Sequence, residues 1–202
     1  MLLISQDNSL QAVWSCSRGD RRLISVDVLE DRISIFDSGP GMDSSEANSI
    51  DKWGKIGASL HRSHKSKAIG GIPPYLMPFF GMFGYGGPYA CMHLGRRTLV
   101  SSKTKLSKKV FTLQLNREAL IENRSILGKN WKADGRMRDP LEEEIKLSPH
   151  GSFTKVEIFE SECKIPEIYQ LQCRLKDIYF PYIQCDEISK TGRTERPVEF
   201  QV

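Results

Sequence analysis

The sequence predicts an α/β fold, and three observations lead to that expectation. Apolar and polar residues alternate over residues 23–28 and 32–36, on either side of a short turn, as in a β-hairpin. A second alternating pair covers residues 97–104 and 108–115 and has a basic tip. Residues 8–16 and 166–179 place apolar side chains near helical spacing. The chain is therefore expected to pack helices against a β-sheet.

The remaining segments are less regular. Residues 44–53 are predicted to be helical with Asp43 or Ser44 as the cap, residues 152–159 to form a strand, and Glu142 to Glu144 to lie on a helix surface. Residues 54–95 hold most of the glycines and fit no ordinary element, and long loops of this kind are usually functional. One domain is expected over residues 1–185, and residues 186–202 are expected to begin a following β-rich domain.

Composition restricts the class of protein. With 202 residues, 39% of them hydrophobic, the chain can bury one substantial core. The net charge of +4 permits contact with nucleic acid but does not require it. The cysteines are odd in number and form no C-x-x-C pair, which indicates reduced thiols (Cys16, Cys91, Cys163, Cys173 and Cys185). No apolar run could span a bilayer, so a soluble intracellular protein without a membrane partner is expected.

The first candidate site is the segment DSGPGM, residues 37–42, at the exit of a predicted strand. A carboxylate at the end of a buried strand, next to glycines that allow close approach, can accept a hydrogen bond from the amino group of a flat ligand such as adenine. The alternative is an ordinary tight turn, because Asp, Ser, Pro and Gly all favour turns.

Two further segments favour a nucleotide. Asn8 lies on the predicted first helix, where its side-chain oxygen can contact Mg²⁺. The glycine-rich segment GMFGYGG, residues 81–87, leads into a predicted helix, and such a start offers backbone N–H groups to phosphates. A Walker A sequence is absent, which excludes a P-loop site.

This order of motifs resembles the GHKL ATPases. Residues 80–105, which run from the glycine-rich segment into the basic hairpin, are most similar to the microrchidia and SMC flexible-hinge-domain ATPases, and closest to the plant type induced by gamma irradiation and mitomycin C. The resemblance implies a Bergerat fold, an α/β two-layer sandwich with a mixed sheet and helices on one face. It also implies an ATP- and Mg²⁺-binding, nuclear chromatin or DNA-repair protein that dimerises through its ATPase head, with DNA or chromatin proteins as partners.

The resemblance also assigns residues. Asn8 is expected to bind Mg²⁺, Asp37 to accept from the adenine amine, and Thr154 to lie near the adenine. The base pocket is assigned to Gly39, Gly41 and Met42, and the phosphate lid to Gly81, Gly84, Gly86 and Gly87. Packing in the core is the alternative role for Met42, and a plain loop is the alternative for the lid glycines.

The departures from the family pattern concern hydrolysis. The family's general-base Glu stands four residues before the Asn, where this chain has Ile4, and Asp7 lies on a neighbouring helix face. Pro88 stands where microrchidia proteins usually have a lid lysine. No catalytic residue is therefore assigned, and hydrolysis is expected to be weak or absent. The first helix is expected to be truncated, because only three residues precede Ile4. The alternative is a chromatin interaction or dimerisation module that works without nucleotide.

Two other features favour plain interpretations. His61 and His64 are expected to lie in a solvated loop, because no further ligands stand near them. The basic tip, residues 101–109, could contact DNA phosphates, but charge patterning favours a solvated hairpin end.

Overall fold

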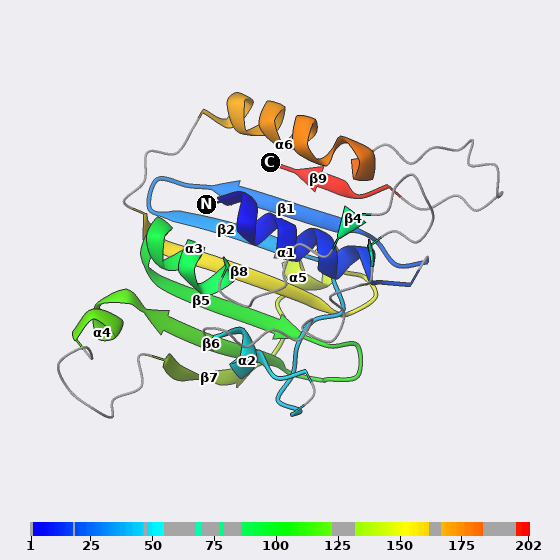
Figure 1. Ribbon diagram of the computed structural model, residues 1–202. Helices are drawn as coiled ribbons and strands as arrows, with labels where there is room; N and C mark the ends of the chain where they lie inside the picture. The colour runs from blue at the N-terminus through cyan, green and yellow to red at the C-terminus, as the bar shows by residue number, and fades with distance from the viewer. Residues whose placement is uncertain are drawn as a thin grey trace.

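Figure 1 shows the computed structural model of the chain. The structure describes residues 2–17, 19–46, 48–54, 68–69, 77–78, 86–122, 132–161, 167–183 and 197–202. Gly81, Gly84, His61 and His64 lie outside these residues, so the predictions made for them stay predictions.

The described part of the chain contains helices between pairs of strands and between single strands. The helices are α1 (Leu2–Trp14), α2 (Ile50–Trp53), α3 (Gly86–Leu94), α4 (Arg117–Glu122), α5 (Glu142–Leu147) and α6 (Ile168–Ile183). The strands are β1 (Leu23–Val28), β2 (Arg32–Asp37), β3 (Ala68–Ile69), β4 (Met77–Pro78), β5 (Gly95–Lys103), β6 (Val110–Asn116), β7 (Lys132–Arg138), β8 (Phe153–Ser161) and β9 (Glu199–Gln201). Among the described helices, none is long and apolar enough to cross a membrane.

Seven strands form the main sheet, in the order β7-β6-β5-β8-β2-β1-β9. The β1–β2 and β5–β6 pairs are the two predicted hairpins, and both are confirmed. β9 joins the edge of the sheet parallel to β1, whereas the other pairs are antiparallel, so the sheet is mixed. The α/β two-layer sandwich is thereby confirmed, and it agrees with the Bergerat fold that the resemblance implied. The expected second domain from residue 186 stays a prediction.

The main core lies between one face of the sheet and the three longest helices, as Figure 1 illustrates. Leu10 and Val13 come from α1, Cys91 from α3, and Leu171 and Leu175 from α6. The opposite face has a smaller cluster, which consists of Leu23, Phe36, Val110 and Phe153, with Leu147 of α5 packed against it. The helix layer is therefore on one face, except for the short α5.

The predicted helix over residues 44–53 is mostly wrong, because only its last turn is helical. The Asp43 side chain accepts from the backbone N–H and the hydroxyl of Ser45, which stabilises a turn in place of a helix start. Ser49 is the actual N-cap of α2, where its side chain accepts from the N–H of Asp51.

The basic hairpin tip makes ion pairs within the protein. Lys105 Nζ lies 2.6 Å from Asp20 Oδ2, and Lys109 Nζ lies 2.7 Å from Asp139 Oδ1. These contacts neutralise part of the charge that a DNA contact would use.

Candidate functional site

Asp37 is the last residue of β2 and only 5% exposed. Its Oδ2 accepts from the Ser9 hydroxyl at 3.0 Å, and its Oδ1 accepts from the Gly39 N–H at 3.0 Å. Because each carboxylate oxygen can accept two hydrogen bonds, both oxygens keep the capacity to accept another donor. The Asp37 carboxylate is thus fixed in place by α1 on one side and by the following loop on the other.

Burial raises the pKa of Asp37 to about 7, and the Gly39 N–H and the Ser9 hydroxyl oppose this increase. A buried carboxylate favours partners that stabilise its charge. An N–H donor from a bound ligand is such a partner, and an exocyclic amine on a flat base supplies one.

Two glycines beside Asp37 leave no room for side chains. A Cβ atom on Gly39 would lie 2.7 Å from both the Ala12 Cβ and the Asp37 Oδ1. A Cβ atom on Gly41 would lie 2.0 Å from the Lys103 carbonyl oxygen, and its φ of +70° is in the left-handed region that favours glycine. These positions therefore require glycine for the path of the loop itself.

A row of polar side chains continues from Asp37 across the sheet. Asp37 lies opposite Thr154 on β8, and Thr154 lies opposite Ser102 on β5, so all three face the helix layer. The Ser102 and Thr154 hydroxyl oxygens are 2.8 Å apart, and the Ser102 oxygen accepts from the Met42 N–H at 2.7 Å. The structure thus brings Asp37, Met42 and Thr154 into one region, as the resemblance implied.

Met42 also takes part in core packing. Its side chain packs against the main core, which was the alternative for this residue. Its contribution to a base pocket stays a prediction.

The start of α3 lies against Asn8. A Cβ atom on Gly87 would be 3.3 Å from the Asn8 Nδ2 and 3.1 Å from the Trp53 ring. The N-terminal turn of α3, with Gly86 and Gly87, therefore approaches the part of α1 that carries Asn8. An α-helix N-terminus presents backbone N–H groups to anions, so this junction is a candidate position for phosphate.

The Asp7 carboxylate accepts a hydrogen bond from another helix. Its Oδ1 accepts from the Tyr179 hydroxyl of α6 at 2.7 Å, and burial raises its pKa. This contact agrees with the expectation that Asp7 is a poor substitute for a base at position 4.

Three residues that hold the site were missed by the sequence reasoning. Ser9 binds Asp37, Ser102 connects Met42 to Thr154, and Asn48 Nδ2 donates to the Gly41 carbonyl at 3.0 Å. Only Ser9, directly after Asn8, could have been suspected from its position. Ser102 and Asn48 act through pairings that the sequence pattern does not reveal.

Comparisons with known proteins identify proteins that are similar to the chain. No protein-family model matches it. A solved structure of the ATPase and transducer domains of DNA topoisomerase II from Balamuthia mandrillaris aligns with 79% of this chain and 36% of its own, at 18% identity and a TM-score of 0.48.

A much closer relative is the structural maintenance of chromosomes flexible hinge domain-containing protein GMI1 of Arabidopsis thaliana. It is 69% identical over 228 residues, which cover 97% of this chain and 14% of the relative. The chain therefore corresponds to a small part of that protein. At this level of identity over nearly all of its residues, the chain belongs to the family of SMC flexible hinge domain-containing proteins.

Proposed function

We propose that this chain is the ATP-binding head of an SMC-hinge-type chromatin or DNA-repair protein of the nucleus. One observation carries the proposal: a buried carboxylate stands at the end of β2, and it is followed by two glycines at which any side chain would collide with protein atoms. A turn alone would not need a carboxylate with a pKa raised to about 7, because an exposed Asp or Asn forms such a turn at lower cost.

The residues present fit ATP with Mg²⁺. Asp37 would accept from the adenine amine, and the crowded glycines Gly39 and Gly41 would hold the turn that positions this carboxylate. Asn8 would contribute a side-chain oxygen to Mg²⁺, which neutralises phosphate charge when bound. The first N–H groups of α3, at Gly86 and Gly87, would bind the phosphates.

Turnover is expected to be slow. The position four residues before Asn8 is occupied by Ile4, which cannot take a proton, and the Asp7 carboxylate is engaged by Tyr179. Loss of a positioned general base costs about 10² to 10⁴ in rate. We infer that nucleotide occupancy, with head-to-head association and contact with DNA or chromatin proteins, carries the function.

The test uses Asp37→Asn, with Asp27→Asn on β1 as the control because Asp27 is exposed. Fluorescent ATP and GTP analogues are titrated against each protein, with and without Mg²⁺. Since guanine has a carbonyl where adenine has its amine, the parent should prefer ATP. Asp37→Asn should weaken ATP by about 1 to 3 kcal/mol, or roughly 5- to 150-fold, and leave GTP and the control unchanged.

Equal ATP affinity of Asp37→Asn and the parent would disprove the adenine pocket. If the correctly folded parent binds neither nucleotide, the nucleotide-independent interaction module is the better description.

A further inference from the structure

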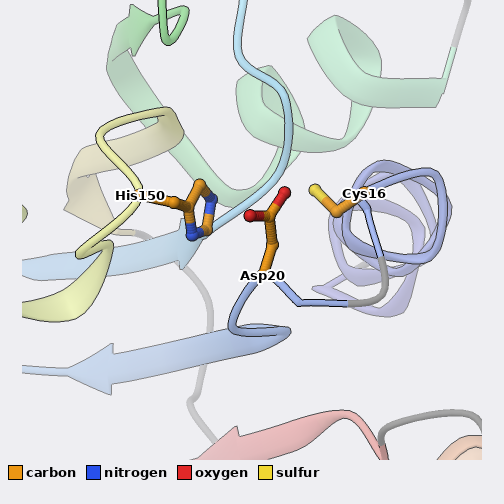
Figure 2. A group of neighbouring side chains, drawn as sticks. All are labelled: Cys16, Asp20 and His150. Atoms are coloured by element: carbon orange, nitrogen blue, oxygen red, sulfur yellow. The ribbon is translucent and has the colours of Figure 1, made fainter.

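Next to Asp37, at Ser38, a second group of side chains converges from three separate segments. Cys16 follows the end of α1, Asp20 lies in the turn before β1, and His150 lies in the loop between α5 and β8. One ligand atom from each lies within 4.8 Å of the other two, and all three residues are half-buried. Figure 2 shows the three side chains directed toward one another.

Two of these side chains share one acceptor, the backbone carbonyl oxygen of Ser38. The Cys16 thiol donates to it at 3.5 Å, and the His150 Nε2 lies 2.9 Å from it. Because a carbonyl oxygen only accepts, that ring nitrogen carries a proton. The Nδ1 of His150 is buried and has no hydrogen-bond partner among the described residues. The protein groups around this imidazole thus leave it incompletely satisfied.

The donor atoms match one metal in particular. Thiolate sulfur, imidazole nitrogen and carboxylate oxygen together are ligands of Zn²⁺, which prefers four of them in a tetrahedron. Bonds of about 2.0 to 2.3 Å place ligand atoms roughly 3.3 to 3.8 Å apart. The atoms here are within 4.8 Å, so contraction on the order of 1 Å would close the site. Side chains on a helix end and two loops can move by that amount.

We propose that Cys16, Asp20 and His150 form a zinc site, with the Ser38 carbonyl oxygen or a water as the fourth ligand. When zinc binds, the Cys16 thiol loses its proton to solvent. A neutral imidazole carries one N–H, so His150 binds through Nδ1, or through Nε2 after the Nε2 proton has moved to Nδ1. Lys105 Nζ donates to Asp20 Oδ2 at 2.6 Å, and the Ser17 backbone N–H also donates to this carboxylate, so zinc would share Asp20 with both donors. Since Ser38 directly follows Asp37, bound zinc would fix the end of α1 and the loop before β8 to the end of β2.

The proposal does not depend on nucleotide binding. Metal-free protein is titrated with Zn²⁺ against a chromophoric chelator, and with Co²⁺, whose thiolate bond gives a near-ultraviolet charge-transfer band. The expected result is one equivalent of Zn²⁺, a cobalt–thiolate band, and a higher melting temperature with zinc.

Cys16→Ser and His150→Gln should each weaken zinc binding by more than the roughly 10- to 100-fold typical of an outer-shell partner, and Cys16→Ser should remove the cobalt–thiolate band. Cys173→Ser is the control, because Cys173 is exposed on α6, and it should bind like the parent. Circular dichroism verifies the fold of each variant, and His150→Gln tests the site even if Cys16→Ser unfolds. Absence of stoichiometric zinc in the folded parent, or equal binding by the parent and both ligand variants, would overturn the proposal.

Discussion

At the scale of single residues, the loop after β2, residues 38–42, depends on Gly41 for two independent reasons. Its φ is +70°, and a Cβ atom would lie 2.0 Å from the Lys103 carbonyl oxygen. Gly41→Ala should therefore lower the free energy of unfolding by about 1 to 3 kcal/mol or more. Urea denaturation measures this loss. Gly19→Ala is the control and should stay near the parent, since nothing lies within 4 Å of the added Cβ; a similar loss in both variants would contradict the steric argument.

The raised pKa of Asp37 predicts a pH-dependent stability. The folded carboxyl titrates at about 7, above its ordinary value of 3.8, so the folded state holds the proton more tightly. The stability from this group is fully present below about pH 4 and is lost as pH rises toward about 7. At about 1.4 kcal/mol per unit of pKa, the loss amounts to at most a few kcal/mol.

Asp37→Asn, which cannot titrate, isolates this effect. The unfolding free energy of the parent minus that of Asp37→Asn should fall between pH 4 and 7 and be constant above that range. Denaturant unfolding at several pH values provides the measurement. A difference that does not change with pH would show that the carboxyl keeps an ordinary pKa.

At the scale of elements, the contact between α1 and α6 joins residues far apart in the sequence. The Tyr179 hydroxyl donates to Asp7, and its ring stacks on Phe200 at 5.2 Å. Tyr179→Phe keeps the ring but leaves a half-buried carboxylate without this donor, so it should cost about 1 to 3 kcal/mol of stability. Tyr169→Phe on the same helix, where Tyr169 is 73% exposed, should change little. Equal thermal shifts for the two variants would contradict this role of Tyr179.

How far the sequence predicted each element follows from how local its signal is. The hairpins β1–β2 and β5–β6 were predicted because alternation is a local pattern. Strand β7 was missed because KADGRMR lacks alternating apolar residues and pairs with β6 through a bulge. Glu144 was assigned to a helix surface, yet it is 2% exposed and paired with Arg138. An ion pair with one buried partner cannot be predicted from a run of glutamates.

At the scale of the whole molecule, the candidate site is assembled from parts that only the topology brings together. Asn8 comes from α1, Asp37 from β2, Thr154 from β8, and the Gly86–Gly87 turn from the start of α3. The sequence predicted these residues through a resemblance in the order of motifs, whereas the contacts of Ser9, Ser102 and Asn48 depend on helix packing, strand register and the loop after β2. Register depends on long-range pairing and is not encoded in any one segment.

The same arrangement bears on turnover, because the family resemblance implies a general base one turn before Asn8. Residues 4 and 8 both lie on α1, four apart and so on one helix face, which places position 4 one turn from Asn8. Ile4→Glu should therefore supply a general base and raise the ATPase rate by roughly 10² or more, with little change in ATP affinity. Ile4→Gln is the matched control, because it has the same length but cannot accept the proton. Phosphate release under single-turnover conditions separates the chemical step from binding, and Asp37→Asn in the Ile4→Glu background should remove the gain at limiting ATP. If the unaltered chain hydrolyses ATP as fast as Ile4→Glu, and Asp37→Asn abolishes that activity, another residue acts as the base and the head turns over nucleotide after all.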